Sequence, residues 1–348
     1  TGISPIMLDD LTSGFNIMEN LTIEEELNEV LGFTSRDVES IMKRLGITNE
    51  EIKIDLAEYY NGYLFNLFGK DRVYNPDMIL YFLKKFQRTK RPPRKLIDDN
   101  VKTDYGRLQR LISNKKNRAT LEKIILEERI NENIVTRFSF DRMYDREYFV
   151  SLLFYMGLLT IDKEERFKLI LKIPNYVIKT IYWDYIKKSL REEYQIEFDL
   201  PNLNESIAQL AFEGKVEPYI EYISQHILKQ LSNRDLQNFD EKYIKVILFS
   251  YLTTTRAYKT YSEREVEDGY IDIFLEKDMR SPEVEYEWVW ELKYLKKSDR
   301  DNLEKVKAKG LEKLEEYASS SKFADKKNLK KALIIFIGKD EYEIVRLD

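Results

Sequence analysis

The sequence contains no cysteine and only one histidine among its 348 residues. Disulfides, thiolate metal sites and thiol redox chemistry are therefore excluded, and a structural zinc site is not expected. Any bound metal ion would need oxygen ligands. The sequence also has no apolar run close to the roughly 20 residues that span a bilayer, and no charged-then-apolar leader at its start. We therefore expect a soluble, cytoplasmic protein without a membrane partner.

A phosphate-binding loop is absent as well. The pattern G-x-x-x-x-G-K-[ST] does not occur, because the segments "EGKV", "FGKD" and "IGKD" lack both its spacing and its hydroxyl residue. We expect no ATP hydrolysis from this chain alone. The chain begins at Thr1 rather than at a methionine, which indicates a fragment of a longer polypeptide or a processed protein.

The composition is that of a globular protein with several packed units. Hydrophobic residues make up 43% of the chain and aromatic residues 13%, which is enough apolar material for two or three units. The net charge of -5 is unevenly distributed. From Lys84 to Arg118 there are thirteen basic residues against three acidic ones. Such a region can bind phosphates, or it can be a solvated helical surface with a charged loop at "KRPPRK"; the sequence leaves both interpretations open.

The first half of the chain is predicted to be mainly helical. The segments "NLTIEEELNEVLGF" and "TSRDVESIMKRLG" each begin with a capping residue and end near a glycine, and "TNEEIKIDLAEYYNG" has apolar residues at helical spacing. Two aromatic-rich or apolar segments, "YLFNLFGKDRVYNP" and "GLLTIDKEERFKLILKIPN", are expected to form hairpins. Helices are expected between them, from Asp77 to about Gly157, and again up to about Ser232.

The pattern changes in the last third of the sequence. A helix over "DEKYIKVILFSYL" is followed by predicted strands near 258–276 and 284–295, a charged helix from about 299 to 319, and the strands "ALIIFIG" and "YEIVRL". The predicted fold class is therefore an α+β multi-domain chain. We expect a mostly helical part at 1–165, a helical connector at 166–235 and an α/β domain at 236–348.

Two predicted strands of this α/β domain carry the candidate catalytic residues. If they form a hairpin whose turn is centred between Ser281 and Pro282, Asp272 lies directly opposite Glu291, about 5 Å away. Lys293 shares the face of Glu291 because side chains alternate along a strand. Two adjacent carboxylates could bind Mg²⁺ or Mn²⁺, and the lysine could position an attacking water and stabilise charge on a phosphate. Acids and lysines on the wet face of a hairpin are also common without any such role.

The order of these elements gives a resemblance to a known family. The segment from about Asp240 to the end resembles the PD-(D/E)xK nuclease superfamily, with its helix, its Asp strand, its (D/E)xK strand and a following helix. More narrowly, it looks like the bacterial PD-(D/E)xK domains joined to an AAA-ATPase-like module, in which a glutamate precedes a G-x-x-D element. The matching positions are Glu265, Gly269 and Asp272.

The resemblance implies a restriction-endonuclease-like fold and a role for each matching residue. Asp272 and Glu291 would be metal ligands for Mg²⁺ or Mn²⁺, Lys293 the catalytic lysine and Glu265 a further acid of the catalytic site. Glu241 and Lys313 would be accessory residues. There are two departures from the family's pattern: Tyr270 stands where an arginine is often found, and Lys313 or Glu312 where the following helix often has a glutamine.

The first half resembles the closing part of the same family's AAA-ATPase-like module. The matching segments, in chain order, are "TGISPI", "TSGFNIMENLT", "LGFTSRDVESIM", "YYNGYLF" and "VYNPDMILYFL". The missing phosphate-binding loop would then lie upstream of Thr1.

Two hypotheses follow from the sequence. The first is a metal-dependent nuclease that hydrolyses nucleic-acid phosphodiester bonds, with DNA as the expected substrate and partner. The second is a catalytically silent module that keeps the fold and binds nucleic acid or a protein. The sequence does not distinguish a DNA from an RNA substrate, or cleavage at chain ends from internal cleavage. It also leaves open the base preference, the biological pathway, and whether the chain forms a homo-oligomer or has a protein partner.

Overall fold

The computed structural model describes residues 21–30, 32–98, 114–136, 142, 144–195, 199–231, 240–266, 269–318, 323 and 326–347. Within these ranges, the side chains of residues 51, 193–194, 263–266, 269 and 318 are not described. The chain forms two compact units, Thr1–Tyr182 and Trp183–Asp348. The expected domain boundaries near residues 165 and 235 stay predictions. None of the helices in the described ranges combines the length and hydropathy needed to cross a bilayer.

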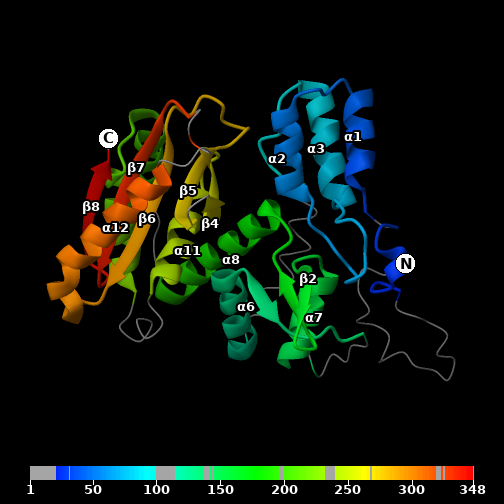
Figure 1. The fold of residues 1–348 in the computed structure, drawn as a ribbon, viewed down its shortest axis with the longest axis horizontal. Helices are drawn as coiled ribbons and strands as arrows, with labels where there is room; N and C mark the ends of the chain where they lie inside the picture. The colour runs from blue at the N-terminus through cyan, green and yellow to red at the C-terminus, as the bar shows by residue number, and fades with distance from the viewer. Residues whose placement is uncertain are drawn as a thin grey trace. The chain divides into compact units, whose positions relative to one another are not determined.

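The first unit contains helices and one small sheet (Figure 1). Its order is η2 (Glu25–Leu27), α1 (Ser35–Arg44), α2 (Glu50–Tyr60), α3 (Pro76–Thr89), α6 (Lys115–Glu127), β1 (Arg129–Asn131), α7 (Arg146–Tyr155), β2 (Thr160–Glu165) and β3 (Lys168–Lys172). The sheet order is β1-β3-β2, and both pairings are antiparallel. The β2–β3 pair confirms the hairpin predicted over "GLLTIDKEERFKLILKIPN".

Helix α1 begins and ends at the capping residues that the sequence predicts. The Thr34 side chain accepts a hydrogen bond from the Asp37 N–H, and the Asp37 carboxylate accepts one from the Thr34 N–H, which is a complete capping box. The helix ends just before Gly46, which has a φ of 69° and so adopts a left-handed conformation that favours glycine.

Two predictions for the first unit are wrong. The segment "NLTIEEELNEVLGF" has only a three-residue 3-10 turn, η2, within its described residues. The segment "YLFNLFGKDRVYNP" forms no strand pair, but only an isolated bridge between Tyr63 and Val73. Two of its aromatic residues, Tyr63 and Tyr74, are almost fully buried by packing rather than paired in a ladder, whereas Phe68 is exposed. The segments "TGISPI" and most of "TSGFNIMENLT" lie outside the described residues.

The second unit begins within α8 (Tyr176–Tyr194) and continues with α9 (Leu200–Ala208), α10 (Glu217–Tyr222) and α11 (Glu241–Leu252). Between them lie the π-helical turns η4 (Gln209–Glu213) and η5 (Ile223–Ile227) and the 3-10 turn η6 (Leu228–Gln230). Then follow β4 (Tyr258–Val266), β5 (Gly269–Lys277), β6 (Glu287–Leu295), η8 (Lys297–Asn302), α12 (Leu303–Ala318), β7 (Leu329–Ile337) and β8 (Glu341–Leu347).

These strands form one five-stranded mixed sheet in the order β4-β5-β6-β7-β8. Only the β6–β7 pair, which α12 connects, is parallel; the other three pairs are antiparallel. A parallel pair needs a crossover connection, and a charged amphipathic helix supplies it here. The mixed helix and sheet class predicted from the sequence is confirmed.

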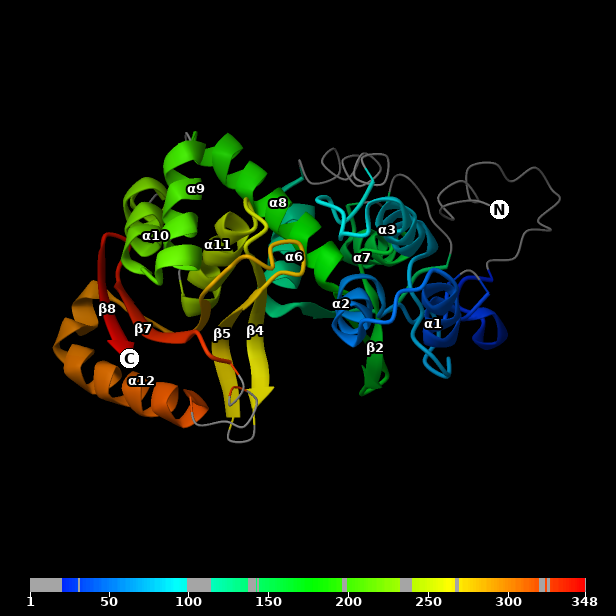
Figure 2. The ribbon, with the colours of Figure 1, turned by 90° about the horizontal axis from the view of Figure 1, so that it is seen from above.

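Helices cover both faces of this sheet. Figure 2 shows α12 on one face and α9, α10 and α11 on the other. On the α12 face, Leu314 packs in one buried cluster with Val289 and Leu333. On the opposite face, Trp290 stacks against Tyr219 of α10, and the Trp288 indole N–H donates to the Leu210 carbonyl at 3.1 Å. The central strand β6 is therefore buried on both sides, which explains why it is so rich in aromatic and β-branched residues.

Candidate active site

Asp272 and Glu291 lie on neighbouring strands at the point where strand pairing stops. In the β5–β6 ladder, Leu275 is opposite Trp288, Phe274 opposite Val289, and Ile273 opposite Trp290. One step further in the same register places Asp272 across from Glu291, as the turn-centred prediction expects. The described ladder ends at Ile273 and Trp290, so the two carboxylates stand just beyond the last paired residues.

Lys293 brings these two acids together. Its Nζ lies 2.7 Å from Glu291 Oε1 and 3.3 Å from Asp272 Oδ2. The Leu292 N–H also donates to Asp272 Oδ2, at 3.2 Å, which fixes that carboxylate against β6. Lys293 therefore contacts both acids that were predicted to form the centre of the site with it.

Two helices add charged side chains to this centre. Glu241 is the first residue of α11, whose N-cap Asp240 accepts a hydrogen bond from the Tyr243 N–H. The Oε2 atom of Glu241 lies 3.8 Å from Lys293 Nζ. From the other face, Lys313 of α12 places its Nζ 3.7 Å from Glu291 Oε1. The structure thus places both predicted accessory residues beside the centre.

The sequence-based prediction did not include Lys245 among the site residues. This lysine of α11 is buried, and its Nζ lies 4.0 Å from Asp272 Oδ1. A signal for it was present, because Lys245 follows Glu241 by four residues and therefore shares its helix face. A buried lysine is uncommon, and here it stands beside a carboxylate of the site.

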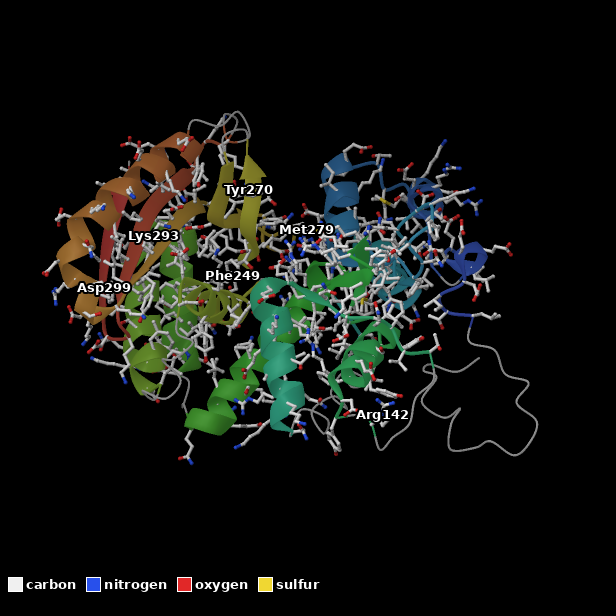
Figure 3. All side chains as sticks on the ribbon, turned by 60° about the horizontal axis from the view of Figure 1, so that its bottom comes forward. Arg142, Phe249, Tyr270, Met279, Lys293 and Asp299 are labelled. Carbon is white, nitrogen blue, oxygen red and sulfur yellow. The ribbon has the colours of Figure 1, made fainter. Side chains whose placement is uncertain are left out.

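The other predicted positions are only partly described. Glu265 lies on β4, where its backbone pairs with Tyr270, but its side chain is outside the described residues, so its role stays a prediction. Tyr270, which stands where the family often has an arginine, is 57% exposed on β5 (Figure 3).

Burial makes two acids of this site, Glu291 and Glu241, costly to ionise. Glu291 has no exposed surface, and burial, followed by the neighbouring charge of Asp272, raises the pKa of Glu291 to about 7. Burial also raises the pKa of Glu241. Although burial alone would lower the pKa of Lys293, the attraction of Asp272 and Glu291 outweighs it and raises that pKa. Lys293 is therefore a firmly protonated cation.

The donor set fits a hard divalent ion. Both carboxylate oxygens of Glu291 are buried and accept no hydrogen bond of good geometry, although the Lys293 ammonium is close to one of them. Buried carboxylate oxygens without donors have unused lone pairs, and such oxygens are ligands that Mg²⁺ and Mn²⁺ prefer. Within the described ranges, no three or more acidic or histidine side chains converge closely enough to hold an ion by themselves. Asp272 and Glu291 would be the protein ligands, and a bound ion would supply Lewis acidity at a phosphate.

The site thus consists of two carboxylates and a lysine on the middle strands of a mixed sheet that is flanked by helices. Residues 239–344, from the start of α11 into β8, match the PD-(D/E)XK nuclease superfamily. This part of the chain is a domain of that superfamily. The superfamily suggests a nuclease that is generally metal-dependent, typically with ions such as Mg²⁺, and it implies a nucleic-acid substrate. No curated protein matches the chain significantly.

Proposed function

We propose that this protein is a metal-dependent nuclease that hydrolyses phosphodiester bonds of DNA, with Mg²⁺ or Mn²⁺ as its cofactor. The observation that carries the proposal is the meeting of Asp272, Glu291 and Lys293, with both carboxylates within 3.3 Å of the ammonium. These residues lie within the segment that matches the nuclease superfamily.

Each residue has a role that follows from its surroundings. Asp272 and Glu291 would hold the ion, and the Leu292 N–H keeps Asp272 oriented. Lys293 stays protonated, so it acts as a cation that orients a water and stabilises negative charge on phosphorus, not as a base that removes a proton. Glu241 and Lys313 are accessory residues on the two flanking helices, and Glu265 is proposed as a further acid of the site.

The test is cleavage of linear and circular DNA, single- and double-stranded, with Mg²⁺ or Mn²⁺. The unmodified protein is compared with Asp272→Ala and Lys293→Ala, and circular dichroism checks the folding of each. We expect cleavage that needs the divalent ion and is lost in both variants. Retained cleavage in a folded Asp272→Ala variant would refute the assigned roles. Cleavage of circular DNA would show internal rather than end cleavage.

The alternative is a silent module that keeps the nuclease fold and binds nucleic acid or a protein. One observation favours it: Lys293, Lys245 and Lys313 all lie within 4.0 Å of Asp272 or Glu291, so ammonium groups already neutralise the acids. Titration with Mn²⁺ separates the two candidates. A nuclease needs an ion that displaces these ion pairs, whereas a silent module gives no Mn²⁺-dependent change on titration.

For the first part of the chain we propose the closing portion of an AAA-ATPase-like module, on the resemblance of its segments alone. Without a phosphate-binding loop it would not hydrolyse ATP by itself. We also propose a cytoplasmic location, and leave a homo-oligomer or a protein partner as open alternatives. Measuring ATP hydrolysis by the purified chain, with and without DNA, tests the module's expected inactivity.

A further inference from the structure

The end of α3 and the segment after it carry an unbalanced positive charge. Residues 84–95 contain seven basic residues and no acidic one. All seven side chains are exposed. We call these the basic surface: Lys84, Lys85, Arg88, Lys90, Arg91, Arg94 and Lys95.

The backbone under the basic surface is held in place. Phe86 of α3 is buried, and the helix ends at Lys90, whose φ of 55° turns the chain. Further on, Pro93 and Leu96 are buried, and the Leu96 carbonyl accepts a hydrogen bond from the buried Tyr60 hydroxyl at 2.7 Å. The apolar residues anchor the segment, so the cations between them project from a fixed path rather than from a loose tail.

Five of these seven cations have no ion-pair partner among the described residues. Among the described residues, Lys84, Lys85, Arg88, Lys90 and Arg91 take part in no ion pair. The ammonium of Lys85 lies over the ring of Tyr81, with its Nζ 5.6 Å from the ring centroid. The dipole of α3 favours cations in its last turn, but this effect fades beyond the helix end and does not account for Arg91.

We propose that the basic surface binds the phosphate backbone of nucleic acid. Clustered like charges repel each other, and a polyanion relieves that repulsion by exchanging its condensed counterions for the protein's cations. The choice of nucleic acid among polyanions rests on the proposed function. Lysine and arginine contacts to phosphates position a strand without reading its bases, so binding through this surface should be independent of sequence and sensitive to salt.

The test is a binding measurement that does not need catalysis. Fluorescence anisotropy of short labelled DNA, single- and double-stranded, is recorded in EDTA over about 50 to 200 mM salt. The test variant combines Lys84→Gln, Lys85→Gln, Arg88→Gln and Arg91→Gln; glutamine has nearly the helix propensity of the residues it replaces, so α3 should fold. The matched control removes four exposed cations elsewhere in the same unit: Arg36→Gln, Lys43→Gln, Arg44→Gln and Lys168→Gln.

The expected result is a loss of affinity of about tenfold or more at low salt, with the slope of log affinity against log salt reduced by about 2 to 4, in the test variant alone. Equal losses in the test and control variants would overturn the proposal, because net charge rather than this surface would then explain binding. Unchanged DNA binding with loss of binding to phosphatidylserine vesicles would overturn it in favour of a lipid surface. Because the measurement uses no divalent ion, an inactive nuclease site leaves its outcome unaffected.

Discussion

The ammonium of Lys293 lies 2.7 Å from Oε1 of Glu291, a carboxylate with no exposed surface. The two residues are two positions apart on β6, so the alternation of the strand puts both on the face covered by α12. This pair explains why a strand of aromatic and apolar residues carries charges in its buried middle. Each charge offsets part of the desolvation cost of the other. The carboxylate oxygens of Glu291 accept no hydrogen bond of good geometry and so can still bind a ligand.

Without metal, the Glu291→Gln variant should become more stable relative to the unmodified protein as the pH rises. Since the folded-state pKa of Glu291 is about 7, against an ordinary 4.5, the folded state holds this proton more tightly than the unfolded state. The free energy of unfolding therefore falls between about pH 4.5 and 7, by at most about 3 kcal/mol, and glutamine removes this loss. Urea unfolding in EDTA at pH 5 and pH 8 measures it.

For this pH test, Glu285→Gln serves as the control, because it changes an exposed carboxylate close to the same strand. If the free energy of unfolding of Glu291→Gln exceeded that of the unmodified protein by the same amount at pH 5 and pH 8, the raised pKa of Glu291 would be contradicted.

Lys245→Met should tighten Mn²⁺ binding. The ammonium of Lys245, 4.0 Å from Asp272 Oδ1, repels a divalent ion at that carboxylate, and methionine fills a similar buried volume without charge. We expect Mn²⁺ affinity to increase several-fold in calorimetry. Lys242→Met, an exposed position on the same helix, should leave the affinity unchanged. Weaker Mn²⁺ binding in a folded Lys245→Met variant would show that this lysine supports the metal site rather than competing with it.

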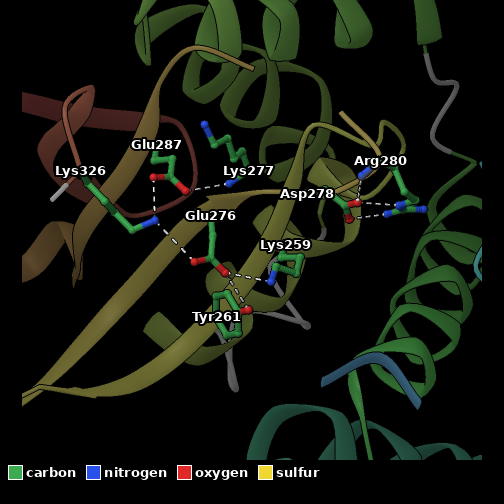
Figure 4. A network of polar contacts seen from close by, with 8 residues as sticks. All are labelled: Lys259, Tyr261, Glu276, Lys277, Asp278, Arg280, Glu287 and Lys326. Atoms are coloured by element: carbon green, nitrogen blue, oxygen red, sulfur yellow. Dashed lines mark hydrogen bonds and ion pairs between the residues drawn. The ribbon is translucent and has the colours of Figure 1, made fainter. Parts of the chain in front are cut away.

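Lys326→Met should destabilise the second unit. Lys326 joins Glu276 and Glu287 in a network with Lys259 and Tyr261 (Figure 4). Glu287 is almost fully buried, and without Lys326 it keeps only a hydrogen bond from the Lys277 N–H. We expect a loss of about 1–3 kcal/mol in urea unfolding, since a buried charge loses its partner. The exposed neighbour variant Lys327→Met should cost less than about 0.5 kcal/mol, and equal losses would rule out the network as the cause.

Gly310→Ala should disturb the packing of α12. A Cβ at Gly310 would lie 2.6 Å from Leu333 Cδ1, closer than carbon atoms approach, so either the leucine or the helix must move. We expect a cost of about 1–3 kcal/mol. Because Lys313 is on the same helix, DNA cleavage should also fall. Lys309→Ala, an exposed position on α12, is the control, and a Gly310→Ala variant as stable as this control would mean that Leu333 can adapt without cost.

Much of the site was predictable from local signals. Alternation of polar and apolar residues, with a turn near Ser281 and Pro282, was enough to put Asp272 opposite Glu291, because strand registers follow from where the turn lies. The capping residue Thr34 and the terminating Gly46 likewise defined α1. These features depend on contacts between residues that are close in the sequence.

Other features depended on contacts between distant residues. The hairpin expected over "YLFNLFGKDRVYNP" became a single bridge between Tyr63 and Val73, and its Tyr63 and Tyr74 side chains pack into the unit's core rather than along a ladder. Lys245 could be placed on a helix face from sequence, but its approach to Asp272 depends on how α11 packs against the sheet. Helix propensity and periodicity carry no information about such packing.

The sequence by itself determined the helix and strand types of the second unit, the register of its central hairpin and the placement of Asp272, Glu291 and Lys293 on neighbouring strands, since these depend on local backbone preferences and side-chain alternation. Only the tertiary structure decided that Glu291 is fully buried, that Glu241, Lys245 and Lys313 join it from two helices, and that the pKa of Glu291 rises to about 7. Burial and charge proximity are properties of the packed chain, because they arise when segments distant in sequence exclude water from the same place.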